Sequence, residues 1–245
     1  MTSRPAAPGA VRPRRVVTDR RGGRSASPYD SFNLGGHVGD DPADVAANRE
    51  RLAGELGVPA DQLVWMTQVH GTGVAIVEDA GENPVADVDA LVTATPGLVL
   101  CVLVADCVPV LLADPVAGVV AAVHAGREGV RRGVVTAALA AMTRLGARPG
   151  DVEALLGPAV CGGDYEVPAA MQAEVARVAP AAAVRTRQGT PGLDLRAGIA
   201  EVLRGAGVRQ VVHDPRCTVE DPRLFSHRRD GVTGRQAGVV WLDAR

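Results

Sequence analysis

The chain has 245 residues, and because it contains no lysine, all 26 of its basic residues are arginine. The absence of lysine excludes Schiff-base chemistry, a pyridoxal-phosphate anchor and a P-loop. The formal charge of −2 and the scarcity of aromatic residues, two each of Phe, Tyr and Trp, argue against a polyanion-binding surface or a base-stacking platform. We therefore expect a small-molecule substrate and no nucleic acid.

The start of the chain, 1–14, is rich in Pro, Ala and Arg, and we expect a disordered basic tail there, followed by one domain at 15–245. No apolar segment typical of a secretory signal follows it. The four cysteines form no Cys-x-x-Cys pair, which fits a reducing compartment, so we expect a cytoplasmic protein. The longest uncharged part of the most apolar stretch, 90–105, is shorter than the roughly 20 residues of a membrane helix, so we expect no membrane partner.

Hydrophobic spacing and turn residues predict interspersed helices and strands along the rest of the chain. In chain order, the expected elements are a strand at 16–17, a helix at 42–56 ended by Gly57, a strand at 63–69, buried strands at 98–104, 108–113 and 118–123, a helix at 129–145, a strand at 152–156, helices at 169–178 and 195–204, and strands at 208–212 and 237–242. Because this order lacks strict βαβ alternation, the sequence predicts an α/β (α+β) fold with a mixed sheet in a single compact domain.

The last two of the three buried strands are separated by the turn 114–117, which predicts a hairpin. If Ala113 pairs with Gly118, the register continued outward places Cys107 opposite His124. The Cβ atoms of directly opposed residues lie about 4.5–5.5 Å apart on one face of a sheet. The pair would suit two ligands of one metal ion, or a thiol and its base, although a single bulge would break this register.

His70, at the end of its own expected strand, is a third candidate ligand. Two His and one Cys are a known ligand set of catalytic zinc, with water in the fourth position, and Asp106 beside Cys107 could support the ligands or handle protons. The spacing alone favours a simpler explanation, a buried thiol at Cys107 and a capping role for His124. Ligands 37 and 17 positions apart match no generic zinc motif.

A glycine-containing segment, with Gly126 and Gly129, leads into the helix expected after His124. The free N–H groups of a helix N-terminus bind anions, so a phosphate, an oxyanion or a carboxylate could lie there. An ordinary strand-to-helix turn explains the same residues.

Ten short motifs, taken in order, resemble the laccase-domain family, whose members carry the names multicopper polyphenol oxidase, purine nucleoside phosphorylase and peptidoglycan editing factor. The resemblance covers about 16–242. The motifs are Thr18-Asp19-Arg20-Arg21-Gly22-Gly23, Asn33-Leu34-Gly35-Gly36-His37-Val38-Gly39-Asp40, Asn48-Arg49, Gln68-Val69-His70-Gly71, Ala105-Asp106-Cys107-Val108-Pro109-Val110, His124-Ala125-Gly126, Leu156-Gly157-Pro158, Tyr165-Glu166-Val167, Cys217-Thr218, and Ser226-His227-Arg228-Arg229-Asp230 with Thr233-Gly234-Arg235.

The resemblance implies that His70, Cys107 and His124 bind one zinc ion. It also implies a single-domain α/β sandwich with mixed β-sheets, similar to the necrotizing-factor-like cysteine hydrolase fold. The chain departs from the family in one place, because Arg127-Glu128 stands where the family has Trp-Arg after His-Ala-Gly. Arg127 or Arg131 could substitute for the displaced arginine.

The resemblance further implies purine nucleoside substrates, namely adenosine, inosine and methylthioadenosine, converted by phosphorolysis, deamination or both. The expected catalytic residues are Cys107, His124 and Asp106. The expected substrate-binding residues are Asn33, His37, Arg49, Gln68, Arg127, Arg229 and Arg235, with Arg20 and Arg228 as further candidates for binding an anion. Most of the 26 arginines are expected to be solvated surface residues.

Two other functions remain open at this stage. A peptidoglycan-precursor editing amidase acting on a UDP-muramyl amino acid would use the same three residues as the purine enzyme. A polyphenol oxidase would need copper, which also binds to two His and one Cys. Copper is disfavoured, because five histidines in the whole chain are too few for a multicopper centre. The remaining thiols, Cys101, Cys161 and Cys217, are expected to serve packing.

Overall fold

Two mixed β-sheets form the centre of the computed structural model, which describes residues 12–81 and 83–243. The four-stranded sheet has the order β1 (Pro13–Val17), β12 (Gln236–Leu242), β5 (Val99–Val104) and β2 (Leu63–Val64). The six-stranded sheet has the order β11 (Gln210–His213), β8 (Glu153–Leu156), β6 (Val108–Asp114), β7 (Val119–Ala125), β4 (Ala90–Thr93) and β3 (Val74–Ile76). Each sheet contains both parallel and antiparallel neighbours, as the sequence predicted.

The two sheets pack face to face, and both faces of each sheet are buried. Alternate side chains of a strand point to opposite faces. On β5, Leu100 and Val102 therefore pack against the six-stranded sheet, whereas Val99 and Leu103 pack on the outer side. Burial on both faces explains why the central strands are nearly continuous apolar runs, the pattern from which the sequence predicted them.

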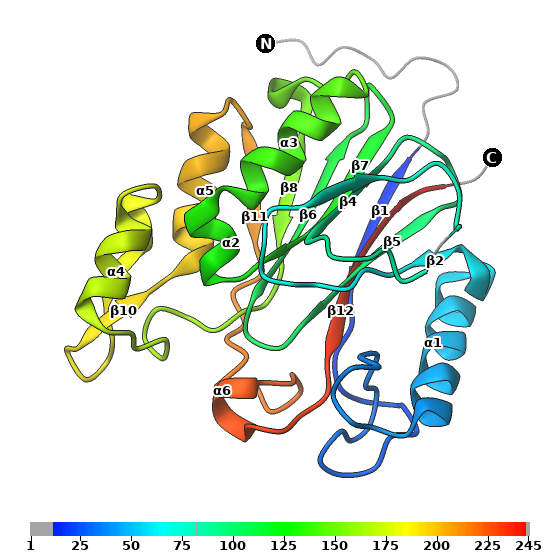
Figure 1. Cartoon of the computed structure of the whole chain (residues 1–245), viewed down its shortest axis with the longest axis horizontal. Helices are drawn as coiled ribbons and strands as arrows, with labels where there is room; N and C mark the ends of the chain where they lie inside the picture. The colour runs from blue at the N-terminus through cyan, green and yellow to red at the C-terminus, as the bar shows by residue number, and fades with distance from the viewer. Residues whose placement is uncertain (1–11, 82, 244–245) are drawn as a thin grey trace.

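Helices cover the two outer faces, so the layers run helix, sheet, sheet, helix (Figure 1). The helix α1 (Pro42–Leu56) covers the four-stranded sheet. The six-stranded sheet is covered by α2 (Arg127–Arg132), α3 (Val134–Arg144) and α5 (Leu195–Gly205). To one side lie α4 (Ala169–Ala176) and the small sheet of β9 (Ala183–Arg185) and β10 (Pro191–Leu193), and the short α6 (His227–Asp230) lies near the loops at 18–40.

Several expected elements differ in extent from the observed ones. The helix expected at 129–145 is two helices, because Gly133 adopts a left-handed φ of 88° between α2 and α3. The strand expected at 63–69 ends as a strand at Val64, and the remainder is a loop that carries His70. The short strands β3, β9 and β10 had no recognisable pattern in the sequence.

The expected basic tail, 1–14, falls mostly outside the described residues. Of its last residues, Pro13 and Arg14 belong to β1, where Arg14 pairs with Trp241 of β12. Edge pairing with β12 therefore begins before the expected strand at 16–17.

The hairpin of β6 and β7 has a register two residues away from the expected one. Ala113 pairs with Val120 rather than with Gly118. Gly118 belongs to the turn instead, since it has a φ of 66° and its N–H donates to the carbonyl of Asp114 at 2.9 Å. A shift of two residues keeps every side chain on its face, whereas a shift of one would reverse it.

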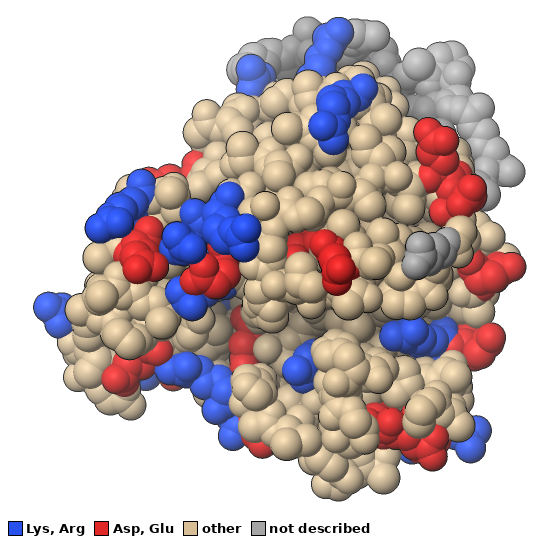
Figure 2. Space-filling model, viewed as in Figure 1, with Lys and Arg blue, Asp and Glu red and all other residues tan. Residues whose placement is uncertain are grey.

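Among the described residues, no helix combines the length and the apolarity that crossing a membrane would require. On the face drawn in Figure 2, basic and acidic side chains lie interspersed over the described part of the surface rather than in areas of one sign.

The turn of this hairpin supplies a test of the fold. The buried carboxylate of Asp114 accepts hydrogen bonds from the N–H groups of Val116 and Ala117, both at 2.9 Å, and from that of Arg148 at 2.8 Å. Hydrogen bonds to a charged group contribute about 1.5–3 kcal/mol each to stability. We expect Asp114→Ala to lower the free energy of unfolding in urea by at least about 2 kcal/mol. Glu50→Ala, which removes an exposed carboxylate on α1, should change it by less than about 0.5 kcal/mol.

Candidate metal centre and its pocket

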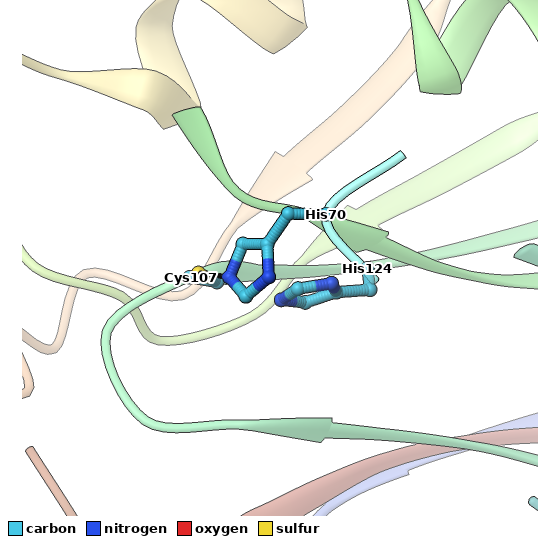
Figure 3. Close-up of side chains that lie close together, drawn as sticks. All are labelled: His70, Cys107 and His124. Atoms are coloured by element: carbon cyan, nitrogen blue, oxygen red, sulfur yellow. Dashed lines mark hydrogen bonds between the residues drawn. The ribbon is translucent and has the colours of Figure 1, made fainter. Parts of the chain in front are cut away.

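Three potential metal ligands that are far apart in the sequence converge at one end of the sheets. The donor atoms of His70, Cys107 and His124 all lie within 4.8 Å of one another. Cys107 Sγ is 3.9 Å from His70 Nε2, and the two imidazole rings meet edge to face with their centroids 4.7 Å apart (Figure 3). The fold thus assembles the two-His, one-Cys donor set that the sequence predicted.

The β6–β7 hairpin carries two of these donors. His124 lies near the end of β7, opposite Pro109, and Cys107 directly precedes β6. The sequence predicted Cys107 directly opposite His124. In the structure it lies two residues before Pro109, the partner of His124, and on the same face of the sheet. The two-residue shift in register explains why the predicted proximity survives although the predicted pairing does not.

Asp89, a fully buried residue just before β4, positions both imidazoles. Its Oδ1 lies 2.8 Å from Nδ1 of His124, which leaves Nε2 of that ring for a metal. Its carboxylate also accepts hydrogen bonds from the backbone N–H groups of Val69 (3.3 Å), His70 (2.9 Å) and Gly71 (2.6 Å). These bonds hold His70 in the left-handed region, at a φ of 56°.

Asp89 was not among the site residues predicted from the sequence. Its only signal in the sequence is an acidic residue directly before the most apolar stretch of the chain. Such a position is buried, and a buried carboxylate needs several hydrogen-bond donors.

Cys107 and His124 each stabilise the charged form of the other. Burial raises the pKa of the Cys107 thiol, but the charge of His124 and the hydrogen bonds from both histidines outweigh it and lower this pKa to about 6. Burial lowers the pKa of His124, but Cys107 and Asp89 outweigh it and raise this pKa to about 9. Without a metal, a thiolate therefore faces an imidazolium at neutral pH, and binding a metal at His124 displaces a proton.

The centre opens into a cavity of about 780 Å³, a size typical of small-molecule sites. Its walls combine apolar side chains with three arginines. The lining residues are His37, Gln68, His70, Leu103, Val104, Ala105, Asp106, Cys107, His124, Arg127, Val160, Tyr165, Leu195, His227, Arg228 and Arg235.

Four of the seven expected substrate-binding residues line this cavity: His37, Gln68, Arg127 and Arg235. Gln68 is fixed by two 2.8 Å hydrogen bonds to the backbone of Leu103.

The other three, Asn33, Arg49 and Arg229, lie outside the described cavity lining. Their side chains form hydrogen bonds with backbone groups instead. Asn33 is fully buried and bonds to the backbone of Gly35 and Arg235. Arg49 donates to the carbonyl of Leu34 and stacks on Trp65.

Arg229 is occupied in the same way as Arg49. Its guanidinium donates to the carbonyls of Thr218 at 2.7 Å and Leu224 at 2.8 Å, and it pairs with Asp230. These contacts hold the loop before α6 rather than a ligand. Arg20, a further expected anion binder, stacks on Phe225 away from the cavity.

Asp106 lines the cavity, but its carboxylate is engaged. Oδ1 accepts from the hydroxyls of Thr218 and Ser226, both at 2.6 Å, and Oδ2 accepts from the N–H of Arg228 at 2.6 Å. Its φ of 90° is also left-handed. These bonds tie the segment that presents Cys107 to two distant loops, so a positioning role fits Asp106 better than the expected catalytic one.

At the departure from the family pattern, α2 begins with Arg127, whose guanidinium pairs with Glu128. Arg131 pairs with the same carboxylate, but only Arg127 belongs to the described cavity lining. Arg127 is therefore the better substitute for the displaced arginine.

Tyr165 and His227 line the cavity and belong to the family motifs, but the sequence did not identify them as site residues. Tyr165 presents its ring beneath the guanidinium of Arg228, 5.2 Å from ring centre to Cζ. His227 begins α6, and its Nδ1 lies 2.6 Å from the carbonyl of Gly231. Their motifs were visible in the sequence, but only the folded loops show that they face the cavity.

The chain is similar to known proteins over almost its whole length. Residues 14–243 match the family model described as multi-copper polyphenol oxidoreductase laccase. A protein of Mycobacterium tuberculosis named purine nucleoside phosphorylase is 59% identical over 234 residues, covering 96% of this chain and 94% of the relative. One of the same name from Streptomyces coelicolor is 58% identical over 227 residues, covering 92% and 94%.

Solved structures also match over almost the whole chain. The crystal structure of YlmD from Geobacillus stearothermophilus superposes with a TM-score of 0.90 at 34% identity, covering 97% of this chain and 94% of that one. Neisseria meningitidis protein NMB0706 superposes with a TM-score of 0.85 at 36% identity, covering 97% and 96%.

Substitution of Asp89 tests its positioning role. Partners that orient a metal ligand typically contribute 10–100-fold to metal affinity. We expect Asp89→Asn to weaken Zn²⁺ binding by about that factor, since the amide would present N–H groups to backbone donors. Competition with a chromophoric chelator measures the affinity. The exposed Asp61→Asn serves as the control, and an unchanged affinity in Asp89→Asn would contradict the assignment.

Gly126 offers a second test, because a Cβ atom there would lie 2.9 Å from Cδ2 of His70 and 3.0 Å from Sγ of Cys107. Gly126→Ala should therefore displace both ligands and weaken Zn²⁺ binding at least about tenfold. Gly54→Ala is the matched control, since its Cβ would meet no atom within 4 Å. Isothermal titration of both variants decides, and equal affinities would refute the close approach.

Proposed function

The chain belongs to the laccase-domain family, and on that premise we propose that it is a zinc-dependent purine nucleoside phosphorylase. Its substrates would be adenosine, inosine and methylthioadenosine, cleaved by inorganic phosphate. The names of the mycobacterial and streptomycete relatives support this activity. The observation that carries the proposal is the single cavity that joins the donors of the metal centre to three arginines.

The arginines suit phosphate binding. Arg127, Arg228 and Arg235 line the same cavity, and guanidinium groups bind phosphate through paired, charge-assisted hydrogen bonds. Because the chain has no lysine, arginine is its only side chain with a permanent positive charge. Phosphorolysis requires such a phosphate site beside the sugar, so that the phosphate oxygen can reach C1′ of the ribose.

The rest of the cavity suits a nucleoside. Leu103, Val104, Val160 and Leu195 supply apolar wall for a purine ring. Among the described lining residues, Tyr165 is the only Phe, Tyr or Trp, and Arg228 already stacks on it. Apolar walls would therefore contribute most of the contact with the base.

The donor set fits zinc. Two imidazoles and a thiolate, one imidazole oriented by Asp89, match a catalytic zinc site that leaves a position open toward the cavity. When bound, zinc supplies Lewis acidity that stabilises developing negative charge. Around it, the residues of this chain have separate tasks: Gln68 and Asp106 fix the cavity loops, and the arginines orient and neutralise the phosphate.

Phosphorolysis ranks ahead of the alternatives because of one observation. Zinc-dependent deamination and amide hydrolysis both typically use a free carboxylate as the proton carrier near the attacked atom. Asp106 is the only carboxylate in the described lining, and three hydrogen bonds occupy it. The oxidase alternative needs many imidazoles, yet the donor cluster contains two, and His213 on β11 lies outside the described lining.

Product analysis tests the proposal. With adenosine as substrate, adenine and ribose 1-phosphate should form only when phosphate is present, and His124→Ala should abolish turnover through loss of the metal. Inosine formed without phosphate would instead identify a deaminase. Cleavage of a UDP-muramyl-serine would identify the amidase, and oxygen uptake on phenols after copper loading would identify the oxidase.

A matched pair of variants locates the phosphate in the same assay. Arg127 and Arg131 both pair with Glu128, but only Arg127 lies in the described cavity lining. Arg127→Ala should raise KM for phosphate about tenfold or more, whereas Arg131→Ala should leave it unchanged. Equal effects of the two substitutions would place the phosphate elsewhere.

A further inference from the structure

A second group of potential ligands lies outside the cavity of the first centre. The donor atoms of Cys161, Asp164, Cys217 and Glu220 all lie within 4.8 Å of one another, and the described cavity lining includes none of these residues. We propose that they form a structural site for a thiophilic divalent cation such as zinc, held by four protein ligands.

The four residues come from two similar turns. Each turn has a cysteine followed three positions later by a carboxylate, in Cys161-Gly162-Gly163-Asp164 and Cys217-Thr218-Val219-Glu220. Structural zinc sites use turns with two to four residues between ligands, and carboxylate oxygens belong to the zinc ligand repertoire. The pattern is thus a pair of zinc-binding turns in which the second ligand of each is a carboxylate.

Backbone contacts hold the two turns side by side. Ala159 forms a parallel bridge with Cys217, and the N–H of Thr218 donates to the carbonyl of Ala159 at 3.2 Å. Within the first turn, the N–H of Asp164 donates to the carbonyl of Cys161 at 3.0 Å. The backbone therefore preorganises the turns that carry Cys161, Asp164 and Cys217.

The two sulfurs point at a common place. Both thiols lie within hydrogen-bond distance of the same oxygen, Asp164 Oδ2, at 3.3 Å for Cys161 and 3.4 Å for Cys217. Cys217 is 3% exposed, and its sulfur accepts the backbone N–H of Cys161 at 3.2 Å. This hydrogen bond fixes the sulfur of Cys217 beside the first turn.

The surrounding charge suits a divalent cation. In the metal-bound form, two thiolates and two carboxylates would carry four negative charges, of which the cation would cancel two. Arg187 pairs with both Asp164 and Glu220 and would cancel a third. It can stay as the partner that orients these carboxylates, since each has a second oxygen for the metal.

The site would also brace the first centre. Thr218, inside the second turn, donates to the carboxylate of Asp106 at 2.6 Å, and the N–H of Val160 donates to the backbone carbonyl of Asp106 at 3.0 Å. Asp106 directly precedes Cys107, so the two turns hold the segment that presents the first thiolate.

Metal counting on the full chain tests the proposal without any activity assay. Protein stripped with a chelator and kept reduced with a phosphine is titrated with Zn²⁺, and parallel samples are loaded with Co²⁺. Wild type should bind two equivalents, and His124→Ala, which disrupts the first centre, should keep one. The cobalt form of His124→Ala should retain sulfur-to-cobalt charge-transfer absorption, and His124→Ala with Cys217→Ser should lose it.

A milder variant guards against misfolding. Glu220→Gln changes an exposed side chain and should weaken the second equivalent about tenfold or more while leaving the first unchanged. Cys101→Ala, which removes a buried thiol elsewhere in the core, should keep both equivalents.

Three results would overturn the proposal. One is a single equivalent in the reduced wild type that Cys217→Ser leaves in place. Another is a second equivalent that persists in Cys217→Ser. The third is a pair of thiols, Cys161 and Cys217, that is isolated as a disulfide and fails to bind metal after reduction.

Discussion

The whole candidate metal centre depends on one buried carboxylate. Asp89 has no exposed surface, and burying a charge is costly unless hydrogen bonds compensate it. Four donors do so: the ring of His124 on β7 and three successive N–H groups around His70. The same bonds that stabilise the charge also fix a strand and a loop relative to each other. The same hydrogen bonds therefore position the ligands and stabilise this corner of the fold.

The sheets supply the rigid frame for that interaction, and the loops supply the chemistry. A strand that slips by one residue exchanges the side chains of its two faces, so close packing against both faces fixes the register that sets His124. The cavity lies where strands end and irregular segments begin, at the ends of β5 and β7 and the start of β6. Backbone conformations rare for non-glycine residues occur there, at His70 and Asp106, each held by bonds from distant segments.

Local pattern predicted the fold's main elements but not its long-range contacts. The strands β5, β6 and β7 were recognised because they are continuous apolar runs, and the proximity of Cys107 and His124 followed from alternation alone. The register was displaced by two residues because Gly118 belongs to the turn. Asp89 leaves no spacing signal, since its partners come from remote segments, and only the folded chain shows that the turns of Cys161 and Cys217, 56 positions apart, lie side by side. With 26 arginines, composition could not separate Arg49 and Arg229, which bind backbone carbonyls, from Arg127.

Two acids near the centre act as scaffolding, and this restricts the chemistry available to it. Asp89 holds the imidazoles from one side, and Asp106 holds the segment of Cys107 from the other, with its carboxylate saturated by Thr218, Ser226 and the backbone of Arg228. Neither is free to carry protons during a reaction. What the cavity offers instead is permanent positive charge from Arg127, Arg228 and Arg235. A reaction whose main demand is to hold and neutralise an anion beside the bond that breaks is the one that such a cavity suits, because preorganised charges stabilise a transition state without having to reorganise.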